Sequence, residues 1–224
     1  FLEPYSPAKT PVLFVHGMHG TPADFAPLLA RLDRTRYQPW LFYYPTGAEL
    51  DTSGFSLLGM LNKLWLEHRF PELHIVAHSM GGLVARSFLN ACGGEGECEF
   101  VRTLVTLASP FGGDVMAESG VKYAPVVMPV WRGMAPDGEF IRSLFERPLP
   151  HGVQHELLFA YRNTSTLSRA SGDGTVPLSS QLRVEAQRQA SGMFGFDENH
   201  VGILANAEVA ERVHAVLAAR SARR

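Results

Sequence analysis

The feature that most constrains this chain is an abrupt change from a strand pattern to a helical pattern at Ser79. Residues 73–77 have the length and apolar character of a buried strand, and residues 80–91 place apolar side chains at helical spacing. Small residues, Ala77 and Gly81, stand two positions before and after the serine. So tight a turn has room only for small side chains there, and it lifts the serine hydroxyl above a sheet edge. The pattern predicts a nucleophilic serine after a strand.

The rest of the chain repeats this alternation between short apolar runs and helical patterns. Such alternation is typical of a mostly parallel sheet with helices on both faces. Hydrophobic residues make up 46% of the chain and charged residues 19%, which suits a single α/β domain over residues 1–224. We expect about six strands, at residues 11–15, 38–44, 73–77, 101–107, 156–161 and 191–196. We expect helices at residues 22–32 with Thr21 as N-cap, and at residues 53–68, 80–91 and 205–219.

A serine nucleophile needs a base to activate it, and the base needs an acid that orients it. After a serine on this kind of turn, the acid and then the histidine follow along the chain. Asp173 lies between glycines after an expected strand, and His200 lies in a loop before the last expected helix. We therefore predict a triad of Ser79, Asp173 and His200. His151 and His155 precede Asp173 and so break this order.

A second loop, within residues 12–20, predicts the groups that would bind the oxyanion of a reacting carbonyl. An apolar strand ends there in a His-Gly pair ahead of a helix. Such a loop supplies one backbone donor, and the residue after the nucleophile supplies the other. We therefore predict that the backbone N–H groups of Met18 and Met80 form the oxyanion hole.

Other polar residues near these motifs have structural interpretations. His16 and His19 are expected to support the loop that contains them, and His78 is expected to point into the structure. Asp197 lies three residues before His200, which places it poorly for reaching the imidazole Nδ1. Taken alone, Asp173 would be an ordinary Asp-Gly turn. Its position along the chain, between the serine and the histidine, favours the interpretation of Asp173 as the acid of the triad.

These motifs together resemble the lipase and esterase branch of the α/β-hydrolases. The chain is most similar to the group that contains small bacterial lipases, inositol-deacylase-like proteins and lecithin-acyltransferase-like enzymes. The matching segments are residues 11–20, 74–86, 104–113, 172–177 and 200–204. The resemblance implies the α/β-hydrolase fold and cleavage of lipid or other apolar esters through an acyl-enzyme, without a metal or organic cofactor.

The long segment at residues 111–150 falls where this fold often carries a cap or lid. A connection between a strand and the next element usually takes only about 2–6 residues. Residues 139–146 have the pattern of a short amphipathic helix. We expect the apolar side chains in this segment to form an acyl-chain wall; packing of a cap onto the core would use the same side chains. The candidates are Met116, Met128, Trp131 and Met134.

Charge and hydropathy limit the partners. The net charge is −2 and basic residues are spread along the chain, so nucleic acid is not expected as a partner. No apolar stretch reaches the length of a membrane span, which leaves transient contact with a lipid surface as the expected membrane interaction. The sequence does not predict an oligomeric state.

The only two cysteines, Cys92 and Cys98, could close a small disulfide loop worth about 2 kcal/mol. Two unpaired thiols are the alternative. A disulfide would indicate a secreted or periplasmic protein, and free thiols a cytoplasmic one. The chain begins at Phe1, which is compatible with a removed leader.

Two other functions are compatible with these motifs. The same triad could pass its acyl group to an alcohol, or cleave an amide or a thioester, because the fold and the triad do not set the substrate. A protein of another class, a non-catalytic binding protein on a hydrolase scaffold, would have lost the reactivity of Ser79.

Overall fold

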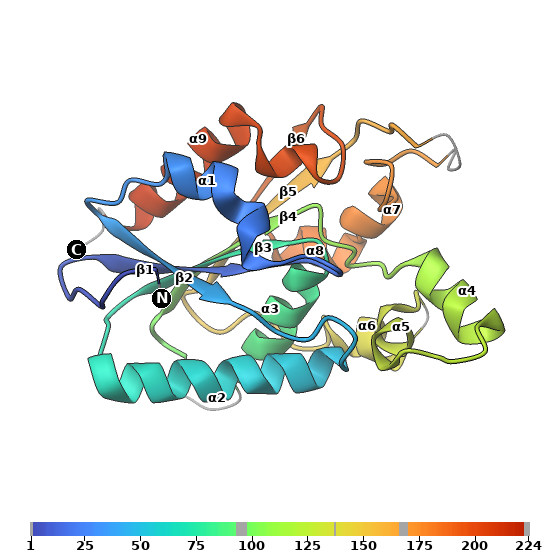
Figure 1. Cartoon of the computed structure of the whole chain (residues 1–224), viewed down its shortest axis with the longest axis horizontal. Coiled ribbons are helices and arrows are strands. Elements are labelled where there is room, and N and C mark those ends of the chain that lie inside the picture. The colour runs from blue at the N-terminus through green and yellow to red at the C-terminus, as the bar shows by residue number, and fades with distance from the viewer. Residues whose placement is uncertain (1, 93–97, 137, 166–169, 222–224) are drawn as a thin grey trace.

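A parallel β-sheet lies at the centre of the molecule (Figure 1). The computed structural model describes residues 2–92, 98–136, 138–165 and 170–221, and in these residues six strands pair in the order β2-β1-β3-β4-β5-β6. Every neighbouring pair is parallel. The strands are β1 (Thr10–Val15), β2 (Tyr37–Phe42), β3 (Leu73–His78), β4 (Val101–Leu107), β5 (Gln154–Ala160) and β6 (Gly192–Phe196). The predicted α/β architecture is confirmed.

Helices cover both faces of the sheet, as expected. In Figure 1, α1 (Ala26–Arg31) and α9 (Ala207–Ser221) lie on one face, and α2 (Leu50–His68) and α3 (Met80–Ala91) on the other. Alternate side chains of β1 enter two separate apolar cores: Phe14 packs on the α1 and α9 side, and Leu13 on the α2 and α3 side. A strand that is buried on both faces has a continuous run of apolar residues, and such runs made these strands predictable from the sequence.

Several predicted boundaries differ from the structure for local reasons. The helix expected at residues 22–32 is split into η1 (Pro22–Phe25) and α1, because Pro27 has no N–H to continue the hydrogen-bond ladder. The expected N-cap is confirmed, since the Thr21 side chain accepts from the Ala23 N–H at 3.3 Å. β2 stops at Phe42, which pairs with the last residue of β1, Val15.

The buried face of α2 also differs from expectation. The helix begins at Leu50 rather than at residue 53, and its buried side includes Leu50, Leu57 and Leu61. Phe55 has helical spacing with Leu58 and other apolar residues of this helix, which predicts burial, but 61% of its surface is exposed. Gly54 allows this rotation, because α2 crosses α3 so closely that a Cβ at this position would lie 2.9 Å from the Ser87 Cβ.

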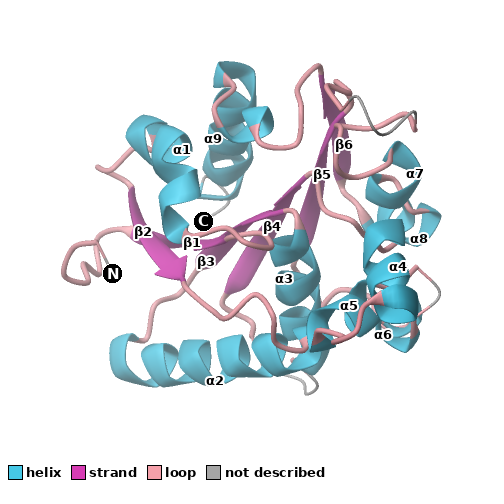
Figure 2. Cartoon of the chain, turned by 45° about the vertical axis from the view of Figure 1, so that its right-hand side comes forward, coloured by secondary structure: helices cyan, strands magenta, loops and turns pink. Residues whose placement is uncertain are grey.

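The segment 111–150 contains more helix than the sequence indicates. It forms α4 (Val115–Tyr123), α5 (Pro129–Met134) and α6 (Glu139–Ser143), the last of which is the expected helix, shortened at its end. Figures 1 and 2 show α4, α5 and α6 grouped near α7 (Leu178–Gln181) and α8 (Val184–Gln189) at one end of the molecule. Apart from α6, these helices are too short or too polar to show an apolar period, so the sequence did not predict them.

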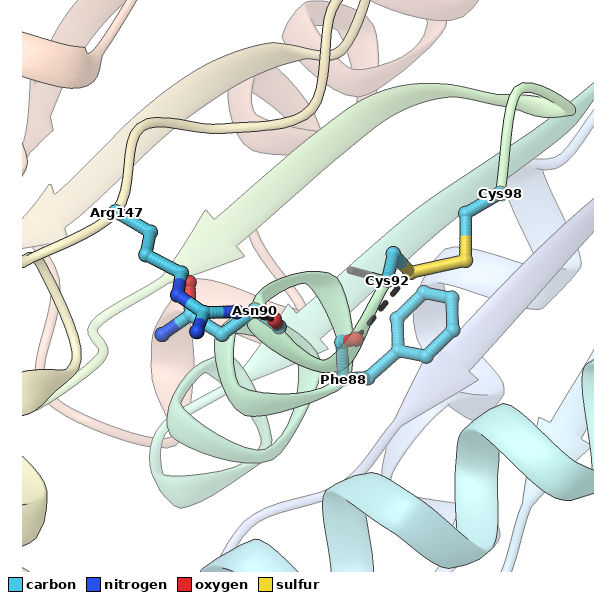
Figure 3. The surroundings of a disulfide bond; sticks show 5 residues. All are labelled: Phe88, Asn90, Cys92, Cys98 and Arg147. Atoms are coloured by element: carbon cyan, nitrogen blue, oxygen red, sulfur yellow. Dashed lines mark hydrogen bonds between the residues drawn. A yellow bond between two sulfur atoms is a disulfide. The ribbon is translucent and has the colours of Figure 1, made fainter. Parts of the chain in front are cut away.

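Cys92 and Cys98 are joined by a disulfide at the C-terminal end of α3 (Figure 3). Their Cα atoms are 5.9 Å apart, a normal separation for a disulfide. The Cys92 Sγ also lies 3.3 Å from the carbonyl oxygen of Phe88, one turn earlier in the helix. The bridge therefore closes the connection between α3 and β4, as the first of the two sequence interpretations expected. The helices that the structure describes include none with the length and hydropathy to span a bilayer.

Candidate active site

Ser79 occupies a strained turn between β3 and α3. Its φ is 53° and its ψ is −129°, a backbone conformation that residues with side chains rarely adopt. Gly81 makes the turn possible, since a Cβ at this position would lie 2.6 Å from the carbonyl oxygen of His16 on the neighbouring strand connection. Ala77 is fully buried. The small residues around the serine thus follow from the close approach of the N-terminus of α3 to β1.

The structure brings Ser79, His200 and Asp173 into one hydrogen-bonded chain. His200 Nε2 lies 2.9 Å from Ser79 Oγ, and His200 Nδ1 lies 2.7 Å from Asp173 Oδ2. A carboxylate only accepts hydrogen bonds, so Nδ1 carries the proton and Nε2 is free to accept the proton of the serine hydroxyl. This tautomer is the one that a general base requires.

Loops at the carboxyl ends of three parallel strands bring these residues together. Ser79 directly follows β3, Asp173 lies between β5 and α7, and His200 follows β6. His200 also donates its backbone N–H to the backbone oxygen of Asp173 at 3.0 Å. Parallel strands end at the same edge of the sheet, so side chains far apart in sequence meet there.

The Asp173 carboxylate is buried, with 1% of the residue exposed, and its hydrogen-bonding capacity is filled. Its Oδ1 accepts the backbone N–H groups of Thr175 at 2.9 Å and Val176 at 2.7 Å. Its Oδ2 accepts from His200 and, at 3.2 Å, from the side-chain amide of Gln181. A buried charge requires such partners. No sequence pattern indicated Gln181, which lies in the unpredicted helix α7.

His78 also contacts His200, the histidine of the hydrogen-bonded triad. The sequence placed it in the interior, and it is buried there with its Nε2 2.8 Å from the backbone oxygen of His200. Because a carbonyl oxygen accepts, His78 Nε2 must donate. Burial, assisted by the neighbouring charge of His200, lowers the pKa of His78 to about 3, so this side chain stays neutral at physiological pH.

The loop predicted to hold the oxyanion packs directly against the serine. A Cβ on Gly17 would lie 2.8 Å from the Cβ of Ser79, so this position must be glycine. Met18 follows it and is half-buried. Met80 is the first residue of α3, where a backbone N–H has no acceptor inside the helix.

Aromatic and histidine side chains hold this loop in place. The Tyr44 hydroxyl donates to the His16 carbonyl oxygen at 2.7 Å, and the two rings stack with centroids 4.6 Å apart. His16 Nδ1 donates to the carbonyl oxygen of Gly17 at 3.0 Å. The supporting interpretation of His16 agrees with these contacts, whereas His19 is exposed.

The rival acid and bases lie elsewhere. Asp197 pairs with Arg162 at 3.1 Å and is exposed. His155 is buried in the sheet with its Nε2 2.8 Å from Thr106 Oγ1, and His151 is exposed. Within the residues that the structure describes, no group of three or more His, Cys, Asp or Glu side chains is arranged to hold a metal ion.

The four side chains expected to line an acyl site do not share one surface. Met116 on α4 is 79% exposed, whereas Met134 at the end of α5 is 4% exposed and belongs to the core. Trp131 packs against Gly120 between α4 and α5, and the Met128 methyl group lies beside Gly47. Their assignment to the substrate remains a prediction.

A small pocket of about 240 Å³ opens beside the triad. Its lining includes Asp173, His200 and Val201. A larger pocket of about 570 Å³ lies at the other end of the strands, between Trp65 and Phe100, where β3 and β4 begin. The larger pocket is therefore remote from Ser79.

Comparisons with known proteins agree on the architecture. Residues 57–142, less than half of the chain, match the family described as the PGAP1-like alpha/beta domain. No curated protein matches the sequence. The crystal structure of the mature form of Bacillus licheniformis lipase BlEst2 superposes with a TM-score of 0.74 at 17% identity, covering 96% of this chain and 94% of that one.

Two further solved structures show the same arrangement. The product of gene lin2722 from Listeria innocua has a TM-score of 0.69 at 15% identity, over 93% of this chain and 94% of its own. Aspergillus fumigatus lipase B has a TM-score of 0.66 at 16% identity, over 92% of this chain and 52% of its own. The chain therefore has the α/β-hydrolase fold, and its motifs and architecture resemble the lipase and esterase branch of that superfamily.

Proposed function

We propose that this protein is a serine hydrolase that cleaves carboxylic esters of apolar, lipid-like acids. The observation that carries the proposal is the continuous chain from Ser79 Oγ through His200 to Asp173, with contacts of 2.9 and 2.7 Å. Hydrogen-bond reach from nucleophile to base, and from base to an orienting acid, is the arrangement that nucleophilic catalysis requires. The lipases among the similar structures support the choice of ester.

The mechanism follows from the donors and acceptors of the site. His200 Nε2 takes the proton of Ser79 Oγ as this oxygen attacks the ester carbonyl carbon. The backbone N–H groups of Met18 and Met80 stabilise the oxyanion. As the carbon–oxygen bond to the alcohol breaks, His200 returns the proton to the leaving oxygen. Water then attacks the acyl carbon while His200 Nε2 takes its proton, and as the bond from this carbon to Ser79 Oγ breaks, the imidazole returns the proton to Ser79 Oγ and the acid is released. No metal or organic cofactor takes part.

The cap formed by α4, α5 and α6 supports a lipid-like substrate. Apolar side chains on and after α4 face solvent: Met116 is 79% exposed, Tyr123 82% and Val126 77%. These three side chains lie within eleven residues of one another, and clustered exposed apolar side chains mark a surface that contacts an apolar partner. We propose that this part of the cap touches lipid transiently, and that the disulfide reflects an oxidising compartment outside the cytoplasm.

A fluorophosphonate probe tests the nucleophile. The folded protein should become labelled at Ser79. The Ser79→Ala variant should not be labelled, and its rate of ester hydrolysis should be at least about 10³-fold lower. Ser56→Ala, which changes an exposed serine on α2, is the matched control and should react as the unmodified protein does. Labelling that persists in Ser79→Ala would refute the proposal.

A series of p-nitrophenyl esters of increasing acyl length tests the substrate class. We expect kcat/KM to rise with chain length beyond acetate, because an apolar site gains affinity with each buried methylene. Preference for acetate would contradict the lipid-like assignment while leaving the serine chemistry intact.

A further inference from the structure

Gln181 contacts both the central sheet and the acid of the triad. Its side chain is buried, with 1% of the residue exposed. Its Oε1 accepts the backbone N–H of Ala160 at 3.0 Å, and its Nε2 donates to the backbone oxygen of Ala160 at 3.0 Å. The same Nε2 lies 3.2 Å from Asp173 Oδ2 and 3.0 Å from the backbone oxygen of Val176. The two hydrogens of this amide are shared among three acceptors, and the amide joins the end of β5 to the loop that carries Asp173.

That loop is also held by contacts within itself and by the backbone bond from His200 to Asp173. The Leu178 N–H donates to the Ser171 backbone oxygen at 2.8 Å, and Gly172 pairs with Pro177 in an isolated bridge. The two backbone donors to Asp173 Oδ1 also belong to this loop. These contacts set the shape of the loop and join it to the loop after β6. The side chain of Gln181 joins it to the sheet, because its two bonds to Ala160 tie it to the last residue of a core strand.

The two carboxylate oxygens of Asp173 have different partners. Oδ1 is held by its own loop, and Oδ2 receives the Nδ1–H of His200 and the Nε2–H of Gln181. Without the amide, only the imidazole would hold Oδ2, and the loop that holds Oδ1 would lose its tie to Ala160, so the carboxylate could shift together with its loop. A small misplacement of an orienting group lowers the rate strongly, because the base then spends less time aligned with the nucleophile.

We propose that Gln181 is a positioning residue for the triad: it holds Asp173 Oδ2 at the distance from the sheet at which the carboxylate orients His200. This inference rests on the proposed function. Gln181 touches neither the substrate nor the reacting atoms, so its effect passes through Asp173.

Gln38 provides an internal control for a purely structural role. It is also 1% exposed, and its side chain also makes hydrogen bonds to backbone groups, with Ser6 N–H, Ser6 oxygen and Lys9 oxygen at 3.1, 2.9 and 3.0 Å. It lies on the edge strand β2, and its side-chain hydrogen bonds join it to the segment before β1 and not to the triad. Gln38→Met therefore measures the loss of a buried amide, and Gln181→Met measures the same loss together with the contact to Asp173.

The experiment compares kcat and KM for a p-nitrophenyl ester in the unmodified protein, Gln181→Met and Gln38→Met, with thermal unfolding of each. We expect Gln181→Met to lower kcat about tenfold or more with KM nearly unchanged, since orientation acts on the chemical step. Gln38→Met should keep kcat within about twofold. If Gln181→Met does not fold, Gln181→Asn keeps a neutral amide but is one methylene too short to reach both Ala160 and Asp173, and we expect the same loss.

A spectroscopic readout separates this inference from the proposed function. In protein labelled with ¹⁵N-histidine, the proton resonance of His200 Nδ1–H reports its bond to Asp173 without any substrate. We expect this resonance to move in Gln181→Met and to stay in place in Gln38→Met. Equal kcat and an equal resonance position in the two variants would overturn the positioning role. An unmodified protein without esterase activity would instead overturn the proposed function, and the resonance would still test Gln181.

Discussion

At the scale of single residues, His200 is held at its backbone and at its ring. Its backbone N–H donates to Asp173, its carbonyl oxygen accepts from His78, and its imidazole bridges Ser79 and Asp173. A base fixed in this way needs little reorganisation when the serine attacks. The neutral state of His78 matters here, because a second positive charge beside the imidazolium would oppose its formation.

Replacing the acid tests this arrangement. Asp173→Asn should reduce kcat by about 10⁴-fold, because an amide donor facing Nδ1 favours the tautomer whose Nε2 carries the proton and cannot accept the serine hydroxyl. Steady-state kinetics with a p-nitrophenyl ester measure the change.

Asp197→Asn is the matched control for that substitution. Asp197 is near His200 in sequence but is exposed and pairs with Arg162, so kcat should stay within about twofold. A large loss in Asp197→Asn with little loss in Asp173→Asn would reverse the assignment of the acid.

At the scale of elements, the site depends on how closely α3 approaches β1. The N-terminal turn of α3 begins directly at the serine, and Gly81 and Gly82 let it pack where a Cβ would collide with its neighbours. The helix is buried along almost its whole length. The strained turn at Ser79 is thus held by packing on both sides, which is the condition under which such a conformation persists.

Two glycine substitutions separate packing from helix propensity. Gly81→Ala should lower the free energy of unfolding by about 1–3 kcal/mol, because the new methyl group meets the backbone of β1 and the segment after it. Gly59 lies within α2, and an added Cβ there would have nothing within 4 Å. Gly59→Ala should therefore raise the free energy of unfolding by about 0.5–1 kcal/mol. Urea unfolding of both variants measures the difference. A neutral Gly81→Ala would contradict the close approach.

At the scale of the whole molecule, burial of histidines makes stability depend on pH. Desolvation lowers the pKa of His155 to about 3, with a contribution from the charge of Arg86, and His78 behaves similarly. An unfolded histidine binds a proton below its ordinary pKa near 6.5, whereas these buried ones do not. Protonation favours neither state above pH 6.5, where these histidines are neutral in both, and each buried histidine increasingly destabilises the folded state as the pH falls from 6.5 toward 3.

His155→Gln should flatten this dependence. Between pH 7 and pH 5 the free energy of unfolding should fall by about 2 kcal/mol less than in the unmodified protein, at about 1.4 kcal/mol for each pH unit below 6.5. Urea unfolding at both pH values provides the measurement. His151→Gln, at an exposed position, is the control and should keep the original dependence. An unchanged pH dependence in His155→Gln would show that His155 titrates alike in both states.

The sequence predicted most of the fold, because a parallel sheet covered on both faces needs continuous apolar strands, and these are visible in one dimension. The sequence-based predictions were wrong or incomplete where a contact between residues far apart along the chain determines the local structure. The rotation of α2 that exposes Phe55 is set by packing on α3, and α4 and α5 are too short or too polar to carry an apolar period. The spread of Met116 and Met134 over different surfaces follows from those helices.

The sequence by itself determined the turn at Ser79, because steric limits on a strand that runs into a helix act between neighbours and must appear as small residues nearby. It also indicated Asp173 and His200 through their order along the chain. Only the tertiary structure decided what holds them. Gln181 and His78 act through contacts that join separate loops to the sheet and to each other, and hydrogen bonds across such distances leave no local pattern in the sequence.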